Sequence, residues 1–182
     1  VMNAYALSQK QDSVVQTRRL LMDLIQEGRG KFFETHGKDK MNAHPFTIVL
    51  KAASNCKTTE SSEEESDFGE ESNILEDPYT IALETYLDLL DDKFDLGVRP
   101  DHFVLAEMLN VVAKHTDSES IERRQRIEEV FGDACSAGQV SSLVVKAMQS
   151  ACPNDIILAD LLRLRGSVAS IESVNMFPRQ WT

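Results

Sequence analysis

Cysteine and histidine are the side chains best suited to bind a metal ion or to form a nucleophile and base pair. In this chain of 182 residues they are scattered, with neither a Cys-x-x-Cys pair nor two histidines one helical turn apart. They are Cys56, Cys135, Cys152, His36, His44, His102 and His115. An odd number of isolated cysteines is typical of a reducing compartment. We therefore expect a binding protein that is not an enzyme and that has no metal and no cofactor.

One group of basic residues has the composition of a phosphate-binding surface. It consists of Arg29, Lys31, Lys38 and Lys40 around Phe32 and Phe33. Cationic side chains can contact phosphates while aromatic rings offer faces on which bases stack. Glu34 and Asp39 lie in the same stretch, so a mixed, solvated loop is the simpler interpretation. Both interpretations stay open at this point.

The segment Gly97-Val98-Arg99-Pro100-Asp101 has the residues that end one helix and begin the next. Glycine adopts the left-handed conformation that closes a helix, and Pro100 prevents continuation. The Asp101 carboxylate can accept hydrogen bonds from the free N–H groups of the following turn, which predicts an N-cap for a helix over 102–115. Such a boundary also joins the units of helical repeats, where Asp101 would have a second role.

The negative charge of the chain is concentrated in one segment. The formal net charge is −11, with 42% hydrophobic and 27% charged residues. Residues 58–77 hold nine acidic residues and no basic one, so the remainder is close to neutral. Its Ser- and Glu-rich composition predicts a disordered acidic insertion, either a solvated loop or a regulatory segment phosphorylated at Ser61 or Ser62. No run approaches the roughly 20 apolar residues that span a bilayer, so we expect no membrane association.

Outside the insertion, apolar residues recur at helical spacing. The pattern predicts helices over residues 12–28, 44–56, 77–97, 102–115, 117–138 and 141–152. In the first of these we expect the helix to close at Gly28, followed by an extended loop. Asp77 is expected to cap the helix that Pro78 opens. Since the period-two spacing of strands is nearly absent, the predicted fold is all-α.

The short apolar helices superpose on one another, which indicates an internal repeat. The equivalent polar positions are Asn3, Lys51, Asn110 and Gln149, at intervals of 48, 59 and 39 residues. Without the 20-residue acidic segment the second interval is also 39. The predicted units are residues 1–43, 44–102, 103–141 and 142–165, followed by a tail over 166–182. We therefore predict an α-solenoid in which neighbouring helical hairpins cover each other's apolar faces.

The stretch HPFTIVLKAASN, a long helix, and then GVRPDHFVLAEMLNVVAK resemble the pentatricopeptide repeat family, and the tail FPRQWT resembles the end of divergent algal members. The resemblance implies a right-handed superhelix that binds single-stranded RNA, with one base read by each repeat. It also implies a role in RNA processing or stability in a mitochondrion or chloroplast. We expect the natural chain to begin upstream of Val1, which would make this the C-terminal portion of a longer protein.

The same resemblance assigns base-reading residues. Thr47 and Asp101 would form the pair of the second unit and would favour guanine, while Asn42 would complete the preceding unit. Ala106 and Val140 occupy these positions in the third unit, and their side chains cannot form hydrogen bonds. The alternative is a protein-binding α-solenoid scaffold that holds a peptide or partner helix in its concave groove. The low net basicity and the acidic insertion favour that alternative.

Overall fold

The computed structural model describes residues 1–35, 42–57 and 77–164. Within these ranges the chain forms helices and no strand, which confirms the predicted all-α class. The helices are α1 (Met2–Ala6), α2 (Gln11–Thr35), α3 (His44–Asn55), α4 (Pro78–Leu90), α5 (His102–His115), α6 (Ile121–Ser136), α7 (Ser142–Ala151) and α8 (Asp155–Leu164). The predicted acidic insertion and the C-terminal tail fall almost wholly outside the described residues.

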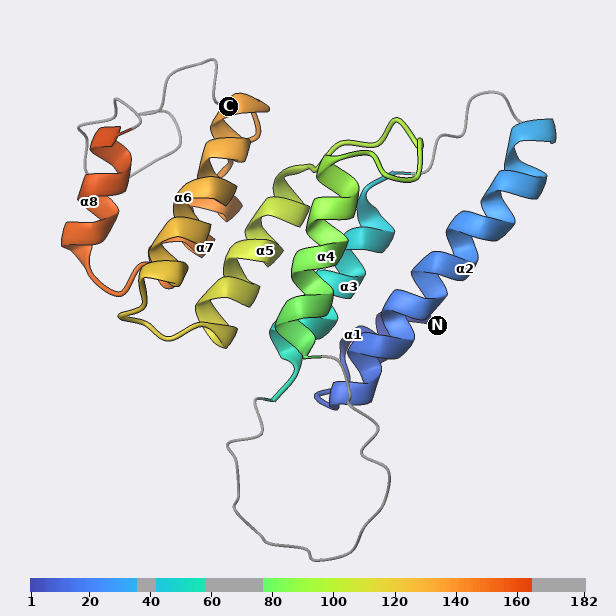
Figure 1. Ribbon diagram of the computed structural model, residues 1–182, viewed down its shortest axis with the longest axis horizontal. Helices are drawn as coiled ribbons and strands as arrows, with labels where there is room; N and C mark the ends of the chain where they lie inside the picture. Colours follow the sequence, from blue (N-terminus) through green and yellow to red (C-terminus); the bar gives the residue numbers. More distant parts are fainter. Residues whose placement is uncertain (36–41, 58–76, 165–182) are drawn as a thin grey trace, which may run out of the picture.

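The helices are arranged side by side in two layers (Figure 1). In the first layer, α1, α3, α5 and α7 pack against one another in chain order. In the second layer, α2, α4 and α6 each pack on the preceding or following helices of the first, and α8 ends the row. In the view of Figure 1, α3, α5 and α7 run in one direction and the second-layer helices in the other.

The hydrophobic core lies between the two layers and is thickest around α5. Seven of the 14 residues of α5 are buried, and they are distributed over successive helical turns. Helix α5 is therefore covered on two faces, and only a narrow strip of its surface is open to solvent. The largest fully buried side chains of the first layer are Phe46, Leu50, Leu105, Met108, Leu109 and Met148. Burial of such side chains contributes about 25 cal/mol per Å² of apolar surface, which makes the core the main source of stability.

The predicted N-caps are confirmed. Both Phe103 N and Val104 N donate to Asp101 Oδ1 at 3.0 Å, and Thr80 N donates to Asp77 Oδ2 at 3.2 Å. Each bond satisfies a backbone donor that the first helical turn leaves without a partner. Asp101 therefore fixes the start of α5.

Two predicted helix ends are wrong, and one helix was not predicted. The first long helix does not close at Gly28 but continues to Thr35, because a helical glycine costs only about 1 kcal/mol and no proline follows. The helix predicted over 77–97 ends at Leu90. Gly97 does have a φ of +65°, yet it closes a turn whose backbone is held by Asp92, not the helix itself. Helix α8 begins at Asp155, two residues after Pro153, and has no counterpart among the predicted helices.

A buried ionic cluster joins α2 to α4. Arg18 Nη2 lies 2.5 Å from Asp88 Oδ2, and Lys93 Nζ lies 2.6 Å from Asp88 Oδ1. Arg18 also donates to the hydroxyl of Thr85. The Asp88 side chain is 8% exposed, so water contributes little to its solvation and the two cations take the place of water around its carboxylate.

A buried arginine joins α6 to the ends of two first-layer helices. Arg123 Nε donates to the carbonyl of Ala151 at 2.8 Å, and Arg123 Nη1 donates to the carbonyl of Thr116 at 3.0 Å. These carbonyls belong to the C-terminal ends of α7 and α5, where four C=O groups lack helical partners and the helix dipole favours a cation. Arg123 therefore holds three helices together.

Candidate functional site

The first layer has an open face that carries polar residues at equivalent positions of successive helices. Asn3 on α1, Lys51 on α3 and Gln149 on α7 are exposed, and Asn110 on α5 is partly exposed. These are the four positions that the repeat alignment identifies. The four residues lie on helices that pack in the order α1, α3, α5 and α7, and we call them the polar row.

The charge on the first-layer helices differs from that of the whole chain. Within the bounds of α1, α3, α5 and α7 the basic residues are Lys51, Lys114 and Lys146, all exposed, and the only acidic residue is Glu107. In the second layer, acidic and basic residues are equal in number on α2, and acidic residues outnumber basic ones on α4, α6 and α8. The two layers are therefore of opposite charge, although the net charge of the chain is −11.

Hydrogen bonds tie the open sides of α3 and α5 together. Glu107 Oε2 accepts from Ser54 Oγ at 3.1 Å and from Asn110 Nδ2 at 3.3 Å. Lys114 Nζ donates to the Ser54 carbonyl at 2.9 Å, and His115 Nε2 donates to the Ala53 carbonyl at 2.9 Å. Both side-chain donors to Glu107 are uncharged, so the hydrogen bonds fix the position of its carboxylate on this face.

An aromatic side chain stands open at the start of α5. Phe103 is 50% exposed, and its ring centroid lies 4.1 Å from that of His102 at an interplanar angle of 38°. An exposed phenylalanine within a polar face is a stacking platform for a flat ligand.

The predicted reading residues Thr47 and Asp101 lie at the N-terminal ends of α3 and α5, which pack together and run in the same direction (Figure 1). Thr47 is partly buried, and its Oγ1 donates to the Ala43 carbonyl at 3.2 Å. Asp101 uses Oδ1 for both capping bonds, which leaves Oδ2 outside the cap. Asn42 is exposed, and its Oδ1 accepts from His44 N at 3.1 Å.

The third-unit positions that lack hydrogen-bonding side chains are also closed. Ala106 and Val140 are each 1% exposed, and Val145 in the fourth unit is 5% exposed. These residues pack in the core, so neither their chemistry nor their position allows contact with a ligand.

The side chains of the predicted phosphate-binding group lie outside the part of the chain that the structure describes. Lys38 and Lys40 lie outside the described residues. Arg29 and Lys31 belong to the C-terminal part of α2, where only the backbone is described.

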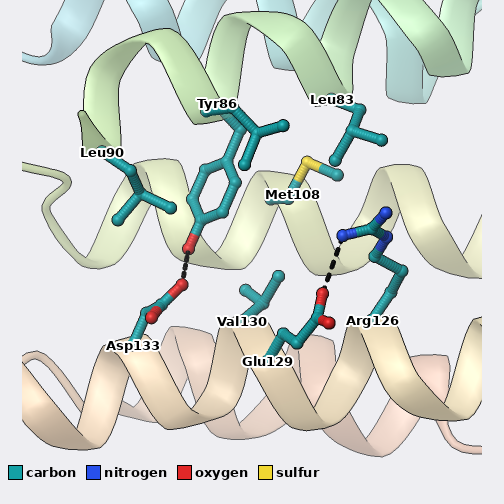
Figure 2. Close-up of a pocket in the computed structure, with 9 residues that line it drawn as sticks. Leu83, Tyr86, Leu90, Met108, Arg126, Glu129, Val130 and Asp133 are labelled. Atoms are coloured by element: carbon teal, nitrogen blue, oxygen red, sulfur yellow. Dashed lines mark hydrogen bonds and ion pairs between the residues drawn. The ribbon is translucent and has the colours of Figure 1, made fainter. Parts of the chain in front are cut away.

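A groove separates the second-layer helices α4 and α6. It has a volume of about 330 Å³, with a floor formed by Met108 of α5. Figure 2 shows Tyr86 of α4 pointing across it toward Asp133 of α6, with the hydroxyl donating to Oδ2 at 2.7 Å. The apolar lining residues are Leu83, Leu87, Leu90 and Val130, and the polar ones Arg126 and Glu129.

Burial raises the pKa of the Tyr86 hydroxyl well above its ordinary value, and the Asp133 carboxylate raises it further. The folded protein therefore keeps this proton at a pH at which the unfolded chain releases it. The contribution of Tyr86 to the free energy of unfolding is fully present below about pH 10 and is lost as the pH rises above that value.

We expect Tyr86→Phe to lower the free energy of unfolding by about 1 kcal/mol at neutral pH, because the Asp133 carboxylate loses a donor. The same variant should lose less stability than the wild type between neutral pH and strongly alkaline pH. Urea denaturation followed by circular dichroism across this range measures both effects. Identical alkaline slopes for the two proteins would show that Tyr86 does not cause the loss.

The open face contains residues to which the sequence alone assigns no role. The repeat alignment makes Lys51, Asn110 and Gln149 equivalent, but it does not show that they face outward. The roles of Phe103 and Glu107 depend on which side of α5 its neighbours cover. The signal in the sequence that could have identified this face is the 39-residue interval, since it places polar residues at equivalent positions of successive helices.

Within residues 1–35, 42–57 and 77–164, no three His, Cys, Asp or Glu side chains come close enough to hold a metal ion together. No helix in the same part of the chain is long and apolar enough to cross a membrane. Compared with family models, with curated proteins and with solved structures, the chain shows no match.

Proposed function

We propose that this chain binds single-stranded RNA along the open face of α1, α3, α5 and α7. The observation that supports this most is the separation of charge between the layers. Lys51, Lys114 and Lys146 face outward on helices with a single acidic residue, in a protein of net charge −11. A polyanion is attracted to such a face and repelled by the rest of the surface.

The proposed architecture is an α-solenoid of helical hairpins similar to pentatricopeptide repeats. Each predicted unit contains one first-layer and one second-layer helix, and first-layer helices pack on each other in chain order. The groove between α4 and α6 widens the spacing in the second layer. Wider spacing on one side bends a stack of hairpins toward the other side, so in the proposed solenoid the polar row belongs to the concave surface.

The proposed RNA contacts are of three kinds. Lysines reach phosphates, Phe103 stacks on a base, and the amides of Asn110 and Gln149 donate and accept hydrogen bonds at base or sugar edges. Asp101 contributes through Oδ2, because its capping bonds use only Oδ1. In this arrangement Asp101 both begins α5 and faces the guanine that the family resemblance implies.

The test is a titration of fluorescently labelled single-stranded RNA, followed by anisotropy at increasing salt concentration. For single strands the logarithm of affinity falls with the logarithm of salt, with a slope of about −0.7 per phosphate contact. We expect Lys51→Glu with Lys146→Glu to weaken binding by about tenfold or more and to make the slope shallower. The matched control is Arg19→Glu with Arg124→Glu, which changes net charge equally on exposed second-layer positions.

Equal weakening by both double variants would contradict a specific face, and undetectable binding of the wild type at low salt would contradict RNA binding altogether. Asp101→Ser tests base reading, since serine is also a good N-cap. We expect the Asp101→Ser variant to lose the preference for guanine-containing RNA while its melting temperature changes little.

The proposed cellular setting is RNA processing or stability in a mitochondrion or chloroplast. The second candidate function is a protein-binding scaffold that uses the same concave face. The half-exposed Leu143 beside Lys146 favours it, because an apolar side chain there suits a peptide better than a phosphate chain. Binding that is insensitive to salt would favour the scaffold over RNA recognition.

A further inference from the structure

We infer that the groove between α4 and α6 binds the apolar face of a basic amphipathic helix from a partner protein. This surface lies in the second layer and is separate from the proposed RNA face. The inference does not depend on RNA binding. It rests on the shape of the groove, on an apolar side of α4 that the chain covers only in part, and on the charge of the rim.

The groove has the form of a site for a third helix. Its two walls are helices, its floor is Met108 of α5, and its lining from Leu83 to Leu90 covers two helical turns, or about 10 Å. Side chains of a helix laid between two others fill the spaces between the ridges of both walls. A volume of about 330 Å³ holds a few large apolar side chains, as in other sites where a helix binds in a groove.

Hydrogen bonds join the two walls at two points. Tyr86 donates to Asp133 at 2.7 Å near one end, and Tyr79 donates to Glu122 Oε1 at 3.4 Å near the other. Each bond joins α4 to α6. A groove that is already open in the free protein binds with less loss of conformational entropy than one that must form on binding.

Helix α4 is apolar on two sides, and the core covers one of them fully and the other only in part. Ile81, Ala82 and Leu89 are at most 2% exposed. Leu83 and Leu90 are only partly buried, and Leu87 is 42% exposed on the groove side. A surface helix normally has one apolar stripe, so a second stripe beside an open groove indicates a surface for another molecule.

Charge at the rim determines the kind of partner. Glu84 and Asp91 lie three and four residues from Leu87, on the same side of α4, and both are exposed. On the other wall Glu129 is exposed, and the only basic lining residue, Arg126, pairs with it at 2.7 Å. Arg99 donates to the Leu90 carbonyl at 3.2 Å and adds one positive charge at one end of the groove. Glu84, Asp91 and Asp133 still leave an excess of negative charge, which favours lysine and arginine beside apolar anchors.

The same charge disfavours other occupants. Phosphates of RNA would be repelled by the acidic rim. A second copy of this chain would bring another net charge of −11 toward it. An extended peptide finds no sheet edge here to pair its backbone, whereas a helix satisfies its own backbone hydrogen bonds.

The test is a methyl NMR titration of the full chain with a synthetic leucine–lysine peptide of helical period. The matched probe is a leucine–glutamate peptide with the same leucine positions. We expect the lysine peptide to give saturable shifts of the methyl signals of Leu83, Leu87, Leu90, Met108 and Val130. The glutamate peptide should leave these signals unchanged.

Variants locate the binding site. Leu87→Lys should weaken binding of the lysine peptide by about tenfold or more, because it places a cation at the centre of the groove. Leu143→Lys is the matched control, since Leu143 is 40% exposed but lies on the first layer. Equal effects of the two substitutions, equal binding of the two peptides, absence of saturation, or shifts confined to other helices would each overturn the inference.

Discussion

Replacing Asp88 by alanine is expected to lower the free energy of unfolding by about 3 kcal/mol. The change removes the carboxylate to which Arg18 and Lys93 both bind, and leaves the partly buried Arg18 guanidinium with Thr85 as its remaining side-chain partner. Breaking one side of a buried ion pair typically costs 3–5 kcal/mol. We expect the lower end, because the Arg18 side chain is 18% exposed and keeps some hydration. Urea denaturation measures the loss.

Two comparisons show whether the ionic cluster is the cause. Asp91→Ala removes an exposed carboxylate from the end of the same helix and should change stability by less than about 0.5 kcal/mol. Arg18→Met combined with Asp88→Leu removes both charges and should recover much of the loss, because no buried charge is then left alone. A double variant as unstable as Asp88→Ala would mean that shape, not charge, determines the effect.

Arg123→Met is expected to lower the free energy of unfolding by about 2–3 kcal/mol. Methionine keeps most of the apolar stem but cannot donate to the carbonyls of Ala151 and Thr116, which lose their charged partner at the ends of α7 and α5. Thermal unfolding followed by circular dichroism gives the size of the loss, and hydrogen exchange should show faster opening in the last turns of α5 and α7.

Arg124→Met is the matched control for this change. Arg124 is the next residue on α6 and is exposed, so its replacement should be close to neutral. Arg123→Lys should lie between the two, because an ammonium group cannot reach two carbonyls with the fixed fork of a guanidinium. Similar losses for Arg123→Met and Arg124→Met would contradict the role assigned to Arg123.

Features set by neighbouring residues in the sequence could be predicted well. The N-caps Asp77 and Asp101 act through backbone groups within three residues, so the sequence contains all the information that the prediction needs. The class of the fold followed from apolar spacing for the same reason. The continuation of α2 beyond Gly28 was missed because glycine weakens a helix without ending it.

Features that depend on packing could not be predicted from spacing alone. Leu83 and Leu90 share a side of α4 with the buried Tyr86, yet they are only partly buried and line the groove. Asp88 looks like an ordinary surface residue until α2 places Arg18 beside it. The positive character of the first layer likewise emerges only when the helices are sorted by the layer in which they pack.

The central claim is that RNA lies on the open face of the first layer. Cross-linking of the wild-type chain to 4-thiouridine-containing single-stranded RNA, with the linked peptides identified by mass spectrometry, tests it directly. The account predicts cross-links in α3, α5 and α7, with Phe103 and the residues beside Lys51 and Lys146 most strongly labelled. Cross-links confined to α2, α4 and α6, or no cross-link at any position, would contradict it.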